Sequence, residues 1–154
     1  MQKLVSTGKT RAVGISNFSI TDIKALLPHQ DEVPISCNQI EVHPWFPQTQ
    51  LIEFHKEHNI LTTCYSPFAG QKKDGATLVK DETVQRLAKE SGLEEGQLLQ
   101  SWAVQRRTIP LGKSATESRI KSNLNVQKLS DEHIKALDQL EIPNGKHYHL
   151  IMGH

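Results

Sequence analysis

The sequence has 154 residues, and its 18 lysines and arginines nearly balance its 17 aspartates and glutamates, which leaves a formal net charge of +1. This length is typical of one domain with its own core, so we expect a single domain over residues 1–154. The balanced charges argue against a nucleic-acid partner, because a phosphate backbone is bound by clustered cations. No apolar run approaches the roughly 20 residues that cross a bilayer, and the start lacks a signal peptide, so we expect a cytoplasmic protein without a membrane partner.

Short β-branched segments alternate with longer segments of helical periodicity along the chain. This alternation is typical of parallel strands joined by crossover helices, and it repeats over four units. The predicted fold class is therefore α/β with a parallel sheet. The expected strands are 11–16, 36–42, 60–66 and 107–111, and the expected helices are 19–27, 49–58, 81–91 and 94–106.

Local signals support several of these boundaries. Ser19 followed by Asp22 suits an N-cap with a first-turn acid, and Pro28 ends that helix. Residues 66–81 contain prolines, glycines and a pair of lysines that break any apolar period, so they predict a loop. A long loop after a strand is a candidate lid in an α/β enzyme, and it is equally typical of a plain surface excursion.

Both cysteines, Cys37 and Cys64, fall within expected strands. We interpret them as reduced thiols of the core or the barrel lining, because a disulfide or a metal pair would need other support. No metal site is predicted.

Polar residues stand at the ends of the expected strands, where parallel α/β folds place ligands. Ser16 and Asn17 stand at the end of the first strand, although this pair is also typical of a turn or cap. Gln39 on the second strand has a donor and an acceptor for a carboxamide. Tyr65 and Ser66 end the third strand, and such a tyrosine either stacks on a flat ligand or, more commonly, packs in the core.

The segment 109–123 places cations and hydroxyl groups around the start of a further helix. Ser114 with Glu117 fits a capping box, so the first-turn amides would face outward beside Lys113 and Arg119. Such an end attracts phosphate. The alternative is a capped helix with a solvated, charged face.

Four motifs in order resemble the aldo-keto reductase family: GISNF at 14–18, NQIEVHP at 38–44, YSP at 65–67 and the IP-GKSAT-R-N run at 109–123. The resemblance implies a parallel half-barrel (β/α)4 that corresponds to the second half of a TIM (β/α)8 barrel. It also implies an NADPH/NADP cofactor and a small carbonyl substrate.

By this resemblance, one group of residues would bind the nicotinamide end of the cofactor. Ser16, Asn17 and Gln39 would bind the carboxamide, Tyr65 would stack on the ring, and Ser66 would lie by the pyrophosphate.

A second group would bind the other end of the cofactor. The 2′-phosphate, which distinguishes NADP from NAD, would be held by Lys113, Ser114, Thr116 and Arg119, and the adenine would contact Asn123. The chain departs from the family pattern at Ser122, where an acid is common, and at Gly112, an extra residue that would shift the phosphate loop.

The family's reaction uses an Asp, a Tyr, a Lys and a His from the first half of the barrel, and none of them has a counterpart in this sequence. We therefore predict no catalytic residue and keep two hypotheses. One is an NADPH-dependent oxidoreductase with a substitute acid or a partner; Tyr148 is a candidate acid, although a surface tail is the commoner reading there. The other is an inert cofactor-binding pseudoenzyme or interaction module, and a truncated product without a selected role is a third possibility.

Four strands cannot close a barrel, since about eight are needed for a packed interior. Open edge strands and an open apolar face favour association. We therefore expect a homodimer through the open barrel edges. One arrangement is an eight-stranded ring with the last strand of each copy beside the first strand of the other, which would crowd two nicotinamide sites at one mouth. The alternative is that the halves associate in some other way.

Overall fold

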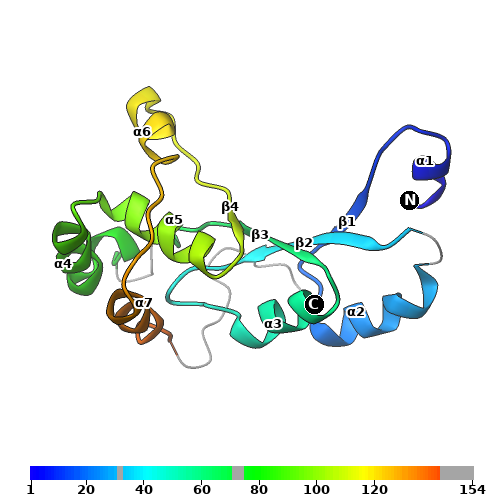
Figure 1. Cartoon of the computed structure of the whole chain (residues 1–154), viewed down its shortest axis with the longest axis horizontal. Coiled ribbons are helices and arrows are strands. Elements are labelled where there is room, and N and C mark those ends of the chain that lie inside the picture. Colours follow the sequence, from blue (N-terminus) through cyan, green and yellow to red (C-terminus); the bar gives the residue numbers. More distant parts are fainter. Residues whose placement is uncertain (31–32, 71–74, 143–154) are drawn as a thin grey trace. The chain divides into compact units, whose positions relative to one another are not determined.

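The computed structural model describes residues 1–30, 33–70 and 75–142, and its four strands form one parallel sheet. The strands are β1 (Val13–Ser16), β2 (Ile35–Glu41), β3 (Leu61–Tyr65) and β4 (Ile109–Pro110). They pair in the order β1-β2-β3-β4, with helices in the connections (Figure 1). The predicted α/β class with parallel strands is confirmed.

Helices occupy the segments where the sequence predicts them, and the structure adds some short ones. The predicted helices are α2 (Ile20–Leu26), α3 (Thr49–Glu57), α4 (Glu82–Ser91), α5 (Glu95–Gln105) and α6 (Glu117–Ser122). The additional ones are α1 (Lys3–Ser6), α7 (Asp131–Asp138) and the 3-10 turns η1 (Leu27–His29) and η2 (Leu78–Lys80). Within the described ranges, no helix has the length and apolar character needed to cross a bilayer.

The helix ends follow from local chemistry. Ser19 is the N-cap of α2 and Asp22 its first-turn acid, as predicted, and the two also form a reciprocal capping box. Asp81 caps α4 by accepting hydrogen bonds from the first-turn amides, and Gly92 ends it with a φ of 66°. In the expected loop 66–81, η2 buries Leu78 completely, and residues 71–74 lie outside the described part of the chain.

The described residues group into two compact units. The first comprises residues 1–40 and 48–63, and the second comprises residues 41–47 and those from 64 onward. Strands β2 and β3 each begin in the first unit and end in the second. The single domain expected over residues 1–154 stays a prediction.

The core of the first unit lies between strands β1 and β2 and helices α2 and α3, which cover the same side of these strands (Figure 1). Ile23 on α2, Ile35 on β2 and Phe54 on α3 are buried against one another with Ile60. Burial of such side chains is the main driving force for this packing.

A β-bulge interrupts the pairing of β1 with β2. Val13 lies opposite Ile35, but Ile15 lies opposite Asn38, so β2 carries one extra residue. The extra residue changes which side chains share a face, because side chains alternate along a strand. Asn38 therefore lies on the helix-covered side with Ile35, and Gln39 lies on the opposite face.

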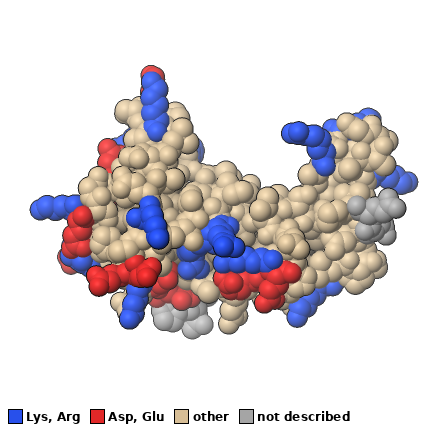
Figure 2. All heavy atoms as spheres, viewed as in Figure 1, with Lys and Arg blue, Asp and Glu red and all other residues tan. Residues whose placement is uncertain are grey.

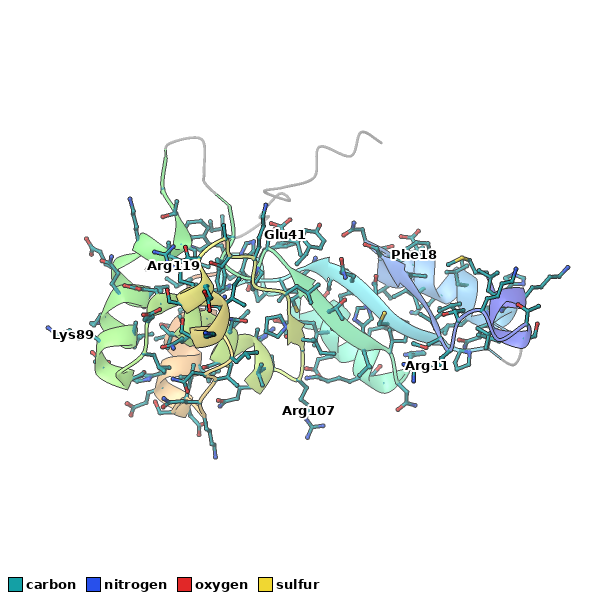
Figure 3. All side chains as sticks on the ribbon, turned by 90° about the horizontal axis from the view of Figure 1, so that it is seen from above. Arg11, Phe18, Glu41, Lys89, Arg107 and Arg119 are labelled. Carbon is teal, nitrogen blue, oxygen red and sulfur yellow. The ribbon has the colours of Figure 1, made fainter. Side chains whose placement is uncertain are left out.

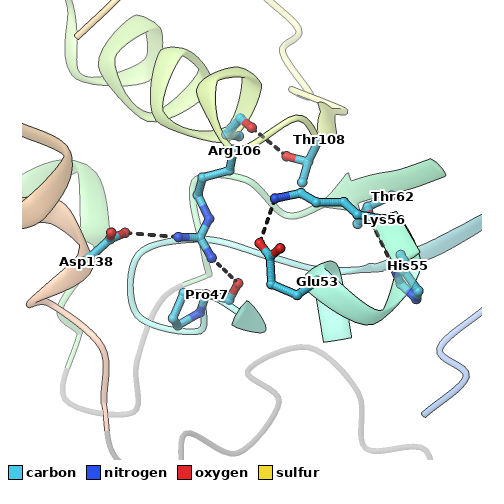
Figure 4. A network of polar contacts seen from close by, with 9 residues as sticks. Pro47, Glu53, His55, Lys56, Thr62, Arg106, Thr108 and Asp138 are labelled. Atoms are coloured by element: carbon cyan, nitrogen blue, oxygen red, sulfur yellow. Dashed lines mark hydrogen bonds and ion pairs between the residues drawn. The ribbon is translucent and has the colours of Figure 1, made fainter. Parts of the chain in front are cut away.

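The second unit is organised around α5, whose Trp102 is fully buried. The Trp102 Nε1–H donates to Asp138 on α7 at 2.8 Å. Arg106 contacts Asp138 at 3.2 Å and donates to the carbonyl oxygen of Pro47 at 3.0 Å (Figure 4). One guanidinium group thus fastens α7 and the loop after β2 to α5. Helix α7 was not predicted, although Ser130 is a standard N-cap and accepts from the His133 amide.

The thiols lie as the sequence suggests. Cys64 is fully buried on β3, and burial raises its pKa to about 11. Cys37 is partly buried, and neither cysteine forms a disulfide.

Candidate cofactor site

The residues predicted to bind the carboxamide meet at the carboxyl ends of β1 and β2. Ser16 lies opposite Gln39 in the strand register. The Ser16 hydroxyl donates to the Gln39 carbonyl oxygen at 3.0 Å, and the Asn17 amide donates to the same oxygen at 2.9 Å. The backbone of Gln39 therefore fixes Ser16 and Asn17, while no hydrogen bond engages the Gln39 side chain within the described residues.

Two of the predicted site residues have a left-handed backbone. Asn17 has a φ of 60° and Ser66 has a φ of 50°. Such conformations cost about 1–3 kcal/mol for residues with a side chain, and they gather at ligand sites. Both stand where a strand ends, so the chain turns sharply there and leaves the preceding Ser16 and Tyr65 at the strand tips.

A buried polar chain that the sequence did not predict lies beneath the first of these turns. Asn38 donates to the Phe18 carbonyl oxygen at 2.9 Å and to His55 Nε2 at 3.1 Å. His55 Nδ1 in turn contacts the Thr62 hydroxyl at 2.8 Å (Figure 4). Because Asn38 donates to Nε2, the proton of the neutral ring is on Nδ1 and is donated to Thr62.

All three members of this chain are buried, with exposed fractions of 0% for Asn38 and His55 and 3% for Thr62. Burial lowers the pKa of His55 to about 4, so the ring is neutral at physiological pH. The signal in the sequence was a histidine on the apolar side of the predicted helix 49–58, since a polar residue at a core position requires partners.

Tyr65 ends β3 and is half-buried. Burial raises the pKa of its phenol, and the Glu41 carboxylate at the end of β2 (Figure 3) raises it further. A raised pKa makes the phenol a weaker acid and leaves the ring neutral. The next residue, Ser66, accepts the Ala69 amide at its carbonyl oxygen at 2.8 Å and so closes the turn after β3.

The residues predicted to hold the phosphate and adenine gather around a cavity of about 540 Å³ in the second unit. This volume lies in the usual range for small-molecule sites. Four predicted residues line it: Lys113, Ser114, Arg119 and Asn123. The predicted Thr116 is not part of the lining; it is the N-cap of α6.

The cations of this cavity are available to an anion. In the part of the chain that the structure describes, neither Lys113 nor Arg119 (on α6, Figure 3) forms an ion pair. The nearby Glu117 pairs instead with Lys121 at 2.8 Å. The lining also contains Lys80 and two carboxylates, Glu94 and Glu95.

The predicted capping box of Ser114 with Glu117 is wrong. Helix α6 begins at Glu117 with Thr116 as its N-cap, so Ser114 lies two residues too early to cap it. The Ser114 hydroxyl instead accepts the Thr116 amide at 3.1 Å. Because α6 has only six residues, the expected contribution of its first-turn amides is small, and the cations dominate the electrostatics of this end.

Gly112 packs against the cavity wall. A side chain there would begin 3.2 Å from Asn123 Nδ2, from Gln100 Oε1 and from the Phe68 ring. Gln100 also donates to the Asn123 carbonyl oxygen at 3.0 Å, so α5 holds the end of α6. Phe68 was not predicted as a site residue, although it is the aromatic residue that lines the cavity.

Charges of both signs lie next to one another on the face shown in Figure 2. The described residues include exposed ion pairs within helices, such as Lys56 with Glu53 at 2.7 Å and Arg86 with Glu90 at 2.9 Å. Pairs of this kind contribute little to stability. Tyr148, considered as a substitute acid, lies outside the described residues.

Comparison with known proteins gives a consistent result. The profile of the Aldo/keto reductase family matches residues 1–142. The chain is 44% identical over 147 residues to aldehyde reductase YPR1 of Saccharomyces cerevisiae, covering 94% of this chain and 46% of that protein. It is 39% identical over 147 residues to a glycerol 2-dehydrogenase (NADP(+)) of the same yeast, and this match covers 95% of this chain and 46% of that protein.

Solved structures agree with the sequence relatives. A crystal structure of an aldo/keto reductase from Brucella melitensis superposes with a TM-score of 0.80 at 30% identity and covers 90% of this chain and 51% of its own. The apo form of Gox0644 gives a TM-score of 0.82 at 29% identity, and the match covers 94% of this chain and 52% of that structure's chain. The chain spans about half the length of the relatives it matches, as expected for half of a TIM barrel. The chain therefore belongs to the aldo/keto reductase family.

Proposed function

We propose that this chain binds NADPH through two groups of residues. Ser16, Asn17, Gln39, Tyr65 and Ser66 would take the nicotinamide end. The 2′-phosphate and adenine would be taken by Lys113, Ser114, Thr116, Arg119 and Asn123. The yeast relative named as an NADP(+) dehydrogenase supports this choice of cofactor. We also propose that the protein is cytoplasmic.

The observation that carries the proposal is the cavity in the second unit. Lys113 and Arg119 line it without a carboxylate partner among the described residues, which suits the charge of a phosphate monoester. Phe68 and Asn123 offer an aromatic ring and an amide to a purine. Glu94 and Glu95 can accept hydrogen bonds from an exocyclic amine or from ribose hydroxyls.

The strand ends suit the other end of the cofactor. The Ser16 hydroxyl proton is donated to the Gln39 carbonyl, so the oxygen of Ser16 can accept from a carboxamide N–H. The side-chain amide of Gln39 can both donate to and accept from the same group. Tyr65 offers a half-buried, neutral ring for stacking on nicotinamide.

We further propose that these 154 residues by themselves bind the cofactor without reducing a carbonyl. Carbonyl reduction requires a proton donor, and general acid catalysis is typically worth roughly 10²–10⁴ in rate. Tyr65 does not suit this role, because burial and Glu41 raise its pKa. The alternative, an NADPH-dependent aldehyde or ketone reductase, is favoured by the name of the yeast aldehyde reductase.

Titration of NADPH and NADH by fluorescence tests the cofactor. We expect NADPH to bind more tightly, and Lys113→Met with Arg119→Met to weaken NADPH by about 100-fold with little effect on NADH. Lys121→Met is the matched control, because Lys121 is a cation on the same helix that pairs with Glu117 and does not line the cavity. Equal affinities for the two cofactors would contradict the proposal.

Oxidation of NADPH in the presence of reactive aldehydes tests the chemistry. We expect binding without turnover. Turnover by the wild-type chain would favour the reductase, and loss of that turnover in Tyr148→Phe, but not in Tyr65→Phe, would identify the substitute acid.

A further inference from the structure

We propose that the buried chain Asn38–His55–Thr62 positions the nicotinamide-binding turn at residues 16–18. This inference rests on the proposed NADPH function and adds residues that would touch no cofactor atom. Its members act through the backbone of Phe18, so they are positioning residues.

The first link joins Asn38 to the turn. Its side chain contacts both backbone groups of Phe18: Nδ2 donates to the carbonyl oxygen at 2.9 Å, and Oδ1 accepts the amide at 3.5 Å. Phe18, labelled in Figure 3, directly follows Asn17, whose φ of 60° has to be maintained by its surroundings. The Asn38 amide and the Gln39 carbonyl thus hold the turn from neighbouring positions of β2.

The β-bulge makes this link possible. Ile15 lies opposite Asn38 because β2 has an extra residue after Ile35. Without the bulge, Asn38 would face away from helix α3, because neighbouring residues of a strand point to opposite sides. With it, Asn38 reaches His55 on α3, and Gln39 keeps its side chain on the face opposite the helices.

The second link fixes the orientation of Asn38. His55 Nε2 accepts from Nδ2 at 3.1 Å, and His55 Nδ1 is held by the Thr62 hydroxyl at 2.8 Å. The ring is fully buried, so it has no water to replace either partner. Loss of the Thr62 acceptor therefore disturbs the ring, and loss of the ring leaves one Asn38 proton unsatisfied.

The test compares two ligands that differ at the nicotinamide end. NADPH engages both proposed groups of residues, whereas adenosine 2′,5′-bisphosphate carries only the phosphate and adenine end. We expect His55→Leu to weaken NADPH by about tenfold and Thr62→Val by about threefold, with binding of the bisphosphate unchanged. Thr62→Ser keeps the hydroxyl and should retain wild-type affinity for both ligands.

Ile52→Val is the structural control, since it trims a buried side chain of the same helix that takes no part in the hydrogen bonds of the polar chain. Circular dichroism melts establish that each variant is folded, and Thr62→Val serves if His55→Leu does not fold. An unchanged ratio of the two affinities in folded Thr62→Val and His55→Leu would overturn the inference. Failure of the wild-type chain to bind either ligand would instead overturn the proposed function.

Discussion

The two groups of proposed cofactor residues are held by different kinds of contact. At the ends of β1 and β2, the Gln39 carbonyl and the buried Asn38 fix the backbone of residues 16–18. Around the cavity of the second unit, Lys113 and Arg119 are exposed side chains that no ion pair holds among the described residues. Residues 16–18 are thus held by buried hydrogen bonds, whereas the cavity cations are exposed. A substitution that removes the support of residues 16–18 should therefore lower the stability of the fold, and one at the cavity should chiefly lower the affinity for the cofactor.

Replacement of Asn38, which supports the turn of the first group, and of Asn123 in the second group gives the largest expected contrast. Asn38→Ala removes hydrogen bonds from Phe18 and His55 in a fully buried place, and we expect the free energy of unfolding to fall by about 2–4 kcal/mol. Asn123→Ala changes a half-buried cavity residue and should lower it by less than about 1 kcal/mol. Urea titrations measure both. Equal losses would show that the two groups are fixed equally.

The pH dependence of stability gives the next contrast. The pKa of His55 is about 4 in the folded chain, against 6.5 for an ordinary histidine. Between these values the unfolded state binds the proton and the folded state does not, so stability falls as the pH drops from 6.5 towards 4. We expect a loss of roughly 2–3 kcal/mol from this group.

His55→Gln should flatten the slope of unfolding free energy against pH in that window. His58→Gln is the matched control, because His58 is an exposed histidine that ends the same helix. An unchanged slope in His55→Gln would remove His55 as the source.

Two glycines sharpen the comparison further. A side chain at Gly14 would begin 2.5 Å from Cys37 Sγ and 3.0 Å from the Cys37 carbonyl oxygen, so Gly14→Ala forces β1 and β2 apart or moves the thiol. We expect a loss of about 1–3 kcal/mol. At Gly112 the nearest atoms are 3.2 Å away at the ends of side chains that can move, so Gly112→Ala should cost less than about 1 kcal/mol. Thermal melts of the two variants measure whether the surroundings of Gly14 are more rigid than those of Gly112.

The sequence predicted the alternating units and the ends of α2 to α5 because these depend on local signals, such as the Ser19 cap and the Gly92 stop. The sequence also indicated polar residues near the ends of neighbouring strands, and in the structure Ser16 lies opposite Gln39. It did not predict the bulge after Ile35, which appears only when the register of two strands is known. The role of His55 depends on this register. The position of Phe68 in the cavity wall depends on the fold of the turn after β3.

The capping error has a different cause. Ser114 and Glu117 have the spacing of a capping box, but the same spacing also occurs in loops. Here the Ser114 hydroxyl accepts the Thr116 amide before helix α6 begins. A motif of two residues fixes neither the helix start nor its length.

The expected homodimer remains a prediction. Substitutions on the two terminal strands of the sheet, β1 and β4, test it, and their expected effects are the smallest considered. On β4, Ile109 is 46% exposed and the following Leu111 is 44% exposed, whereas β1 alternates half-buried and exposed residues. Exposed apolar side chains on a terminal strand favour pairing with a second copy. We expect light scattering to show a dimer at micromolar concentration.

A charge on β4 should weaken that association more than a charge on β1, because more apolar area is lost there. Ile109→Lys is expected to raise the dissociation constant by about tenfold, and Val13→Lys by less. A stable wild-type monomer would contradict the dimer outright. A dimer weakened equally by both changes would mean that β1 and β4 pair with each other across the two copies, since each contact would then contain both strands.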